Sequence, residues 1–116
     1  DKDGFFFITG RKKELIIKGG ENISPREIDD TLYKHNAVLE ACTFGIKDEN
    51  YGEEISACVF LKDNLSANEE ELLALCTADL GEYKTPSKII FVDEPLPKGP
   101  SGKIQRLKIA SQYSHT

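Results

Sequence analysis

Apolar residues gather along the chain in five short runs that are rich in β-branched and aromatic side chains: "FFFITGR", "ELIIKGG", "AVLEACTFGI", "EISACVFLK" and "SKIIFVD". Runs of this kind, bounded by glycine or charged residues, are typical of β-strands. The first two are separated by basic residues 11–13, so they predict a leading β-hairpin with a basic turn. The third and fourth flank the polar stretch "KDENYGEE", which suits a connection between adjacent strands.

The stretch "NISPREIDDTLYKHN" predicts the first helix. Ser24 is a candidate N-cap, Pro25 takes the first helical position, and Glu27 completes a Ser-x-x-Glu capping box. Ile28 and Leu32 lie about one helical turn apart, so we expect both side chains to face the core.

A second capping box, from Ser66 to Glu69, predicts the start of another helix, because acidic residues suit the positive end of the helix dipole. Leu72, Cys76 and Leu80 repeat at i, i+4 and i+8 along it. The order strands, helix, two strands, helix, strand predicts one α+β domain over residues 1–116. We expect a small mixed or antiparallel sheet with a leading β-hairpin and about three helices packed on it.

The composition narrows the range of partners. The chain has 116 residues, a net charge of −5 and 30% charged residues. This acidic balance argues against nucleic acid as a partner, because a basic footprint would be expected. No apolar run approaches the roughly 18 residues of a membrane span, and the acidic start "DKDG" does not resemble a signal peptide. We therefore expect a cytoplasmic protein with no membrane span.

Three cysteines, Cys42, Cys58 and Cys76, each lie among apolar neighbours, where a free thiol packs as a small hydrophobe. Their odd number argues against a disulfide framework, and their spacing does not fit a zinc site. His35 and His115 have no cysteine, histidine or acidic partner at metal-ligand spacing. We expect no metal site.

The segment "PLPKGPSGKIQR" holds Lys103 between Gly102 and Ile104. A phosphate-binding P-loop would need glycine five residues before Gly102 and a hydroxyl residue after the lysine. Pro97 and Ile104 occupy those positions, so the P-loop is excluded. On these residues alone, a turn built from proline and glycine with a solvated lysine is a sufficient account.

Gly19 and Gly20 suit either an ordinary hairpin turn or a loop whose bare backbone can approach a ligand. Around them, "GFFFITGRKKELIIKGGENISPREID" resembles the segment that opens the C-terminal domain of adenylate-forming enzymes, which include acyl-CoA synthetases, firefly-type luciferases and the adenylation domains of peptide synthetases. "YKTPSKIIFVDEPLPKGPSGKIQR" resembles the segment that closes this domain. The resemblance covers nearly the whole chain.

This resemblance implies a large N-terminal domain that the chain lacks, so we expect a lid fragment that is inactive alone. It implies ATP-dependent chemistry in two halves. A carboxylate and ATP first give an acyl-adenylate and pyrophosphate, and the thiol of CoA then gives a thioester and AMP. The full-length enzyme would use ATP, CoA and Mg²⁺, and none of them is expected to be bound to the isolated domain.

Carried over to this chain, the resemblance gives Lys103 the catalytic role of bridging acyl and phosphate oxygens as negative charge builds up. It places Lys13 at the hinge about which the lid rotates, where many family members have aspartate, and Arg11 near the ribose and phosphate of the nucleotide. It assigns three residues to the loop that lines the CoA tunnel: Gly19, Gly20 and Glu21.

Other charged residues have more ordinary interpretations. Glu53, in "ENYGEE", is expected to cap or pair within its loop. Lys98, Arg106 and Lys108 make the end of the chain locally basic. A solvated face is the favoured interpretation of these three residues, and a contact with CoA phosphate is the alternative.

The favoured function is therefore the C-terminal lid of an ATP-dependent acyl-CoA synthetase. Two alternatives stay open: an adenylation domain that loads a carrier protein, and a free-standing interaction module. The absence of a carrier domain after Arg106 weakens the first, and the start inside a strand-rich motif argues against the second. The expected partners are the N-terminal domain, a small-molecule carboxylate and CoA, but the acid itself cannot be read from this domain.

Overall fold

The computed structural model describes residues 15–48 and 52–113. In chain order its elements are β1 (Ile16–Lys18), β2 (Glu21–Ile23), α2 (Pro25–Leu32), β3 (Val38–Asp48), β4 (Gly52–Leu61), α3 (Glu69–Leu80), the 3₁₀ helix η1 (Glu82–Lys84), β5 (Lys88–Val92) and α4 (Arg106–Tyr113). The α+β class is confirmed. The predicted strand in "FFFITGR" and the basic residues 11–13 lie outside the described residues.

The sheet is mixed, with β4 at its centre. β3 runs antiparallel to β4, with Cys42 opposite Cys58, and β5 runs parallel to β4. β1 meets the beginning of β4 where Lys18 lies opposite Gly52. β2 pairs with β1 through the Gly19–Gly20 turn. The leading hairpin of the described chain is therefore β1–β2.

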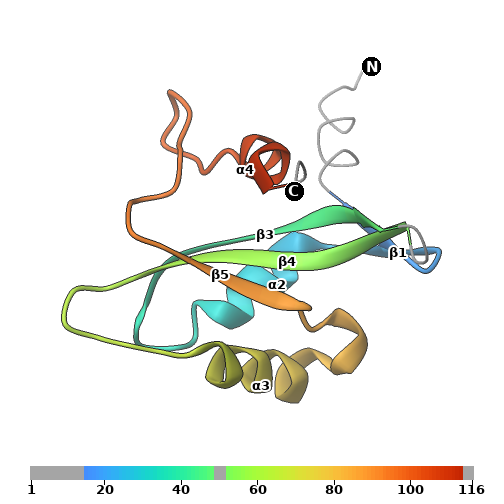
Figure 1. Cartoon of the computed structure of the whole chain (residues 1–116), viewed down its shortest axis with the longest axis horizontal. Helices are drawn as coiled ribbons and strands as arrows, with labels where there is room; N and C mark the ends of the chain where they lie inside the picture. Colours follow the sequence, from blue (N-terminus) through green and yellow to red (C-terminus); the bar gives the residue numbers. More distant parts are fainter. Residues whose placement is uncertain (1–14, 49–51, 114–116) are drawn as a thin grey trace.

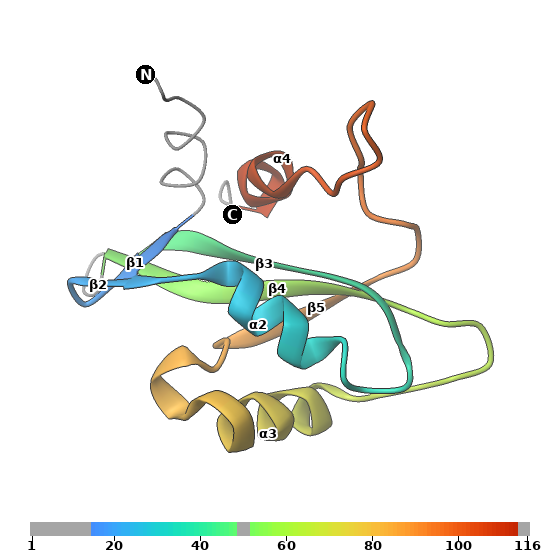
Figure 2. The ribbon, with the colours of Figure 1, turned by 180° about the vertical axis from the view of Figure 1, so that it is seen from behind.

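Helices cover both faces of this sheet: α2 and α3 pack on one face and α4 on the other (Figures 1 and 2). The sequence of β4 follows from this arrangement. Ile55, Ala57 and Val59 belong to the cluster beneath α2 and α3, whereas Cys58 belongs to the cluster that includes Ile109 of α4. Since successive strand residues face opposite sides, a strand covered on both faces is apolar at consecutive positions.

The first predicted helix is confirmed as α2, but its capping box is wrong. Ile28 and Leu32 are fully buried, as expected. Ser24 is the N-cap, yet its side chain makes no capping hydrogen bond. The carboxylate of Glu27 instead accepts a hydrogen bond from Lys84 Nζ at 3.0 Å. This lysine comes from η1, a distant segment that local sequence rules do not consider.

The second predicted helix is confirmed as α3, but its capping box lies two residues further on. Asn68 is the N-cap: its side chain accepts from the Glu71 N–H at 2.8 Å, and Glu71 accepts from the Asn68 N–H at 2.9 Å. Asparagine is at least as good an N-cap as serine, so the later box is competitive. Leu72 and Cys76 are buried, as predicted.

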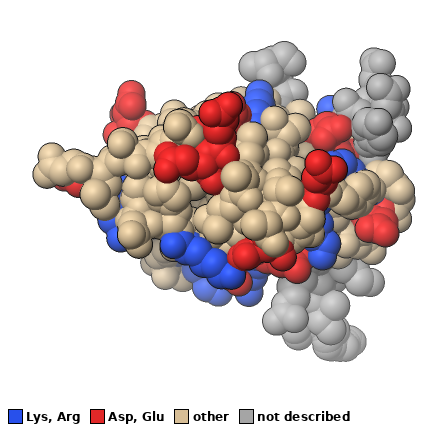
Figure 3. Space-filling view, turned by 90° about the horizontal axis from the view of Figure 1, so that it is seen from below, with Lys and Arg blue, Asp and Glu red and all other residues tan. Residues whose placement is uncertain are grey.

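The sequence predicts about three helices but indicates the positions of only two of them. The third is α4, where Ile109 is the one fully buried residue and Ala110 and Tyr113 pack beside it partly exposed, so its apolar face is short and gives a weak sequence signal. All three cysteines are buried and free, as predicted. On the face where α3 lies, acidic and basic side chains are interspersed (Figure 3). No helix within the described ranges has the length and apolar character needed to cross a membrane.

Candidate functional site

Lys103 lies in a defined hairpin that runs from Pro97 to Gln105, the lysine hairpin. The Gln105 N–H donates to Pro97 O, and the Gly99 N–H donates to Lys103 O, both at 2.9 Å. The Gly102 N–H donates to Gly99 O at 2.9 Å, and Gly102 has φ +85°. Proline at the second turn position followed by a left-handed glycine is typical of a three-residue hairpin loop.

The Lys103 side chain is exposed, and it makes no hydrogen bond or ion pair with any other described residue. It borders a groove of about 680 Å³ whose opposite wall comes from α2 and the start of β3 and includes Arg26, Tyr33 and Leu39. An ammonium group held at the rim of a groove can reach an anion bound beside it.

The first stem of the lysine hairpin is tied to β3 through Glu40. One oxygen of this carboxylate accepts the Leu96 N–H at 2.7 Å, and the other pairs with Lys98 Nζ at 2.5 Å. Glu40 therefore holds both the backbone of Leu96 and the ammonium group of Lys98, at the first stem of the hairpin.

The second stem is tied through Arg106. Its Nη1 donates to Asp29 Oδ2 at 2.8 Å and to Thr43 O at 2.9 Å. The other oxygen of Asp29 accepts the Thr43 N–H at 2.6 Å. Burial raises the pKa of Asp29, and the charge of Arg106 opposes this rise. The pair thus joins α2, β3 and the start of α4.

These contacts correct the interpretation of the basic chain end as a solvated face. Lys98 and Arg106 are ion-paired and Arg106 is largely buried, whereas Lys108 is exposed as expected. Asp29 and Glu40 lie far from this segment in sequence, so residue spacing carried no signal of the pairing. Asp29, an acidic residue that is buried in α2, was the one available hint that a basic partner lies nearby.

The Gly19–Gly20 turn, which we call the glycine turn, has φ of +57° and +87°. A two-residue hairpin turn with both φ positive favours glycine at both positions. The two glycines differ in surroundings. A Cβ on Gly19 would lie 2.5 Å from the Tyr83 hydroxyl, whereas a Cβ on Gly20 would meet nothing within 4 Å. Gly20 and the exposed Glu21 therefore form the open side of the turn.

Tyr83 fastens the glycine turn to η1. Its hydroxyl donates to Lys18 O, and Lys18 Nζ donates in return to Tyr83 O at 3.0 Å while lying 4.7 Å from the ring centroid. Glu53 Oε1 accepts the Ile17 N–H at 2.8 Å. The expected pairing of Glu53 is thus made with strand β1 rather than within its own loop.

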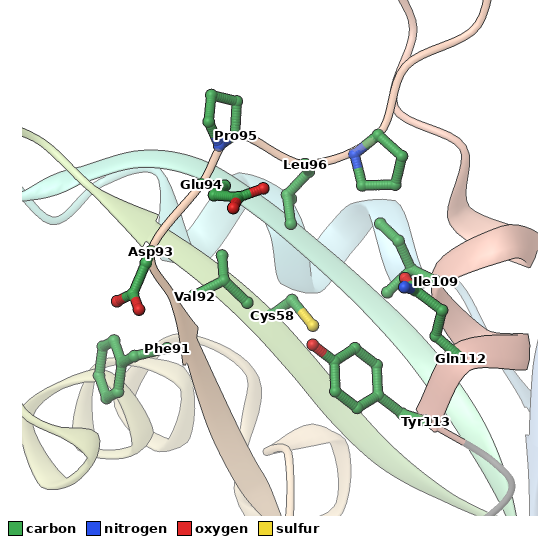
Figure 4. A pocket seen from close by; sticks show the side chains of 11 residues that line it. Cys58, Phe91, Val92, Asp93, Glu94, Pro95, Leu96, Ile109, Gln112 and Tyr113 are labelled. Carbon is green, nitrogen blue, oxygen red and sulfur yellow. The ribbon is translucent and has the colours of Figure 1, made fainter.

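A second cavity, of about 340 Å³, lies between α4 and the end of β5 (Figure 4). The Tyr113 ring points towards Cys58 inside it (Figure 4). Burial raises the pKa of Cys58 to about 11, although a hydrogen bond from Tyr113 opposes the rise. This thiol is therefore protonated at neutral pH and packs rather than reacts.

The structure places Lys103 and the Gly19–Gly20–Glu21 residues in two separate hairpins, which lie towards opposite ends of the molecule (Figures 1 and 2). Arg11 and Lys13 lie outside the described residues. Within residues 15–48 and 52–113, no group of His, Cys, Asp and Glu side chains could hold a metal ion, so none of these residues is assigned to Mg²⁺.

The geometry defines a small α+β domain that presents an anchored cationic hairpin at one end and a bare glycine turn at the other. Residues 27–103 match the family model described as the AMP-binding enzyme C-terminal domain. The chain belongs to this family, which confirms the resemblance found in the sequence.

Curated and solved relatives agree with this assignment. The chain is 54% identical to the sulfoacetate–CoA ligase of Cupriavidus necator over 94% of its length and 21% of that protein. It is 46% identical to the mitochondrial medium-chain acyl-CoA ligase of Rattus norvegicus, over 97% of this chain and 18% of that one. The crystal structure of apo MatB from Rhodopseudomonas palustris superposes with a TM-score of 0.83 at 31% identity, covering 90% of this chain and 21% of that one. The chain thus spans about a fifth of the length of these relatives.

Proposed function

We propose that this chain is the C-terminal lid of an AMP-forming acyl-CoA synthetase. The observation that carries the proposal is Lys103, whose exposed ammonium group stands on a hairpin anchored at both stems. The names of the relatives support it, because both curated proteins described above are CoA ligases. They act on different acids, so we assign CoA chemistry to the parent enzyme but no particular acyl group.

In the first half-reaction, a carboxylate oxygen attacks the α-phosphate of ATP, the bond to pyrophosphate breaks, and an acyl-adenylate forms. Both reactants are anions, so their approach is opposed by charge. Lys103 lies between acyl and phosphate oxygens and stabilises the negative charge that builds up on them. A preorganised donor of this kind contributes on the order of 10²–10³ in rate.

In the second half-reaction, the thiol of CoA attacks the acyl carbonyl and AMP leaves. The glycine turn then lines the CoA tunnel, because Gly20 has no side chain to obstruct the pantetheine arm. The two hairpins lie at opposite ends of the domain (Figure 1), which supports a rotation of the lid that presents each in turn. Lys13 serves as the hinge and Arg11 contacts the nucleotide.

The partner in this proposal is a large N-terminal domain of the same polypeptide, which supplies the carboxylate pocket. ATP, CoA and Mg²⁺ act in the full-length enzyme, and the 116-residue chain alone is inactive. We place the enzyme in the cytoplasm, as expected from a sequence with no apolar run of membrane-span length and a start unlike a signal peptide, and fractionation of the source cells tests this assignment.

The test uses the full-length enzyme that carries this chain, with Lys103→Ala and the matched exposed control Lys108→Ala. We expect acid-dependent ATP–pyrophosphate exchange to fall by about 10² or more in Lys103→Ala, with thioester formation from supplied acyl-adenylate retained. Lys108→Ala should leave both unchanged. If exchange persists in Lys103→Ala, the lysine hairpin is only a turn and the proposal is wrong.

A further inference from the structure

Arg106 follows Lys103 by three residues, and its guanidinium group is the most buried basic group among the described residues near the lysine hairpin. The side chains of Arg106 and Asp29 are only 13% and 9% exposed. An ion pair removed from water in this way often adds little to stability, because desolvation of both charges opposes their attraction. A role in fixing geometry accounts better for a charged pair at this position than a role in stability does.

The contacts of Arg106 join the chain after the lysine hairpin to two elements of the core, α2 and β3. Arg106 Nη1 reaches Asp29 on α2 and the carbonyl of Thr43 on β3, and Asp29 is itself held by the Thr43 N–H. The planar guanidinium group suits such a site because its donors have fixed directions, which the flexible ammonium group of lysine does not reproduce. The backbone that leaves the lysine hairpin is therefore fastened to two elements of the rigid core.

The lysine hairpin itself transmits this constraint to Lys103. Gln105, next to Arg106, donates its N–H to Pro97 O, and Lys103 O accepts the Gly99 N–H, both at 2.9 Å. A displacement at Arg106 would shift this short ladder, and Lys103 belongs to it. In catalysis, a misplacement of about 1 Å costs on the order of 10²-fold in rate.

We propose that Arg106, held by Asp29, is a positioning residue that sets the place of the Lys103 ammonium group for acyl-adenylate formation. This inference rests on the proposed function of Lys103. Arg106 touches no reacting atom in this scheme, and its effect on the rate passes entirely through Lys103. Two consequences distinguish this role from a general contribution to folding.

The first consequence concerns which half-reaction responds. In the full-length enzyme, Arg106→Gln should lower kcat of pyrophosphate exchange at least 10-fold with little change in KM for ATP. Thioester formation from supplied acyl-adenylate should stay within about twofold, because Lys103 takes no part in it. Arg106→Lys, which keeps the charge, should recover part of the exchange rate.

The second consequence is non-additivity. In a Lys103→Ala background, Arg106→Gln should produce no further loss of exchange, because the group through which it acts is gone. Leu72→Ala, which opens a cavity beneath α3 on the far side of the sheet, is the control for lost stability. It should lower the thermal midpoint without this selective loss of adenylation.

Each outcome decides a separate claim. Equal losses in both half-reactions, or an additive loss in the Lys103→Ala background, would overturn the positioning role of Arg106 while leaving Lys103 in place. Full exchange activity in Lys103→Ala alone would instead overturn the proposed function. Should Arg106→Gln fail to fold, Arg106→Lys and Asp29→Asn are carried through the same assays, and unchanged exchange in both overturns the inference.

Discussion

The lysine hairpin and the glycine turn are built on the same plan but are held in different ways. Both are tight hairpins that use a left-handed glycine with open space at its Cβ position, Gly102 in one and Gly20 in the other. Ion pairs from α2 and β3 hold the first. Hydrogen bonds and the Tyr83 ring hold the second.

The difference in the contacts that hold the two hairpins matches the group that each hairpin exposes. The lysine hairpin presents a charged side chain, and a point charge is effective only if its position is set. The glycine turn presents bare backbone, whose use is to leave room. Two short ion pairs at one end, and mainly hydrogen bonds with one longer Lys18–Glu54 pair of 4.0 Å at the other, are consistent with a domain whose two ends serve different chemical steps.

Reciprocal substitutions give the largest expected effect. Gly20→Leu in the full-length enzyme should slow thioester formation on the order of 10²-fold and spare pyrophosphate exchange, because the new side chain enters the CoA tunnel. Gly102→Leu should do the reverse, since it displaces Lys103. Separate assays of the two half-reactions measure both.

Gly81→Leu is the matched control for this pair. Gly81 also has a positive φ, +91°, and open space at its Cβ position, but it ends α3 and belongs to neither hairpin. It should share the backbone strain of the other two variants without selectivity for either step. If all three variants slow both steps equally, strain explains the losses and the two-ended scheme is wrong.

Within the glycine turn, Gly19 and Gly20 should differ in stability when each is replaced by alanine. Left-handed backbone costs an alanine about 1–2 kcal/mol, which is the whole expected effect at Gly20. At Gly19 the new Cβ also collides with the Tyr83 hydroxyl, so we expect about 2–3 kcal/mol in total. Urea unfolding of the 116-residue chain measures the difference.

Tyr83→Phe identifies the source of that difference. Alone it should cost about 1 kcal/mol, because the hydrogen bond to Lys18 O is lost. Combined with Gly19→Ala it should cost less than the sum of the two, since the colliding oxygen is removed. Additive losses would show that the Tyr83 hydroxyl is not the source of the extra cost of Gly19→Ala.

Elements set by interactions between residues close in sequence could be predicted, and those set by distant residues could not. The apolar period and local turn residues predicted β1, β3, β4, β5, α2 and α3, because those signals lie within a few residues of one another, whereas the short strand β2 was not predicted. The capping boxes were less reliable, since Glu27 found a distant lysine and Asn68 competed with Ser66. The roles of the site residues came from family resemblance, and all of them stay predictions, including those of Lys103, Gly19, Gly20 and Glu21 as well as Lys13 and Arg11.

What the sequence could not supply was the set of partners that hold the site. Arg106 and Asp29 are 77 residues apart, and apart from the position of the acidic Asp29 next to the core residue Ile28, nothing in either segment indicates the other. α4 was missed for a different reason: Ile109 is its one fully buried residue, and Ala110 and Tyr113 pack beside it only partly buried, so its apolar pattern in the sequence is short.

The pH dependence of stability gives the smallest effect and tests the Asp29–Arg106 pair most directly. Burial raises the pKa of Asp29 above its ordinary value of 3.8, so the native state holds this proton more tightly than the unfolded state. The contribution of Asp29 to stability therefore falls as pH rises from 3.8 through the native pKa. Arg106 opposes the shift, and in Arg106→Gln the fall should extend to higher pH.

The free energy of unfolding of the 116-residue chain, measured in urea at pH 5, 6 and 7, checks the predicted direction of the pH dependence. Arg106→Gln should have a lower free energy of unfolding than the unsubstituted chain at pH 7, and this difference should become smaller at pH 5. The reason is that a protonated Asp29 is neutral and no longer needs a cation beside it. Other groups near the pair, including Arg26, Asp30 and Cys42, are common to both chains. Adding Asp29→Asn to both should abolish the narrowing. A deficit that widens towards pH 5 would mean that Asp29 does not carry the charge that Arg106 neutralises.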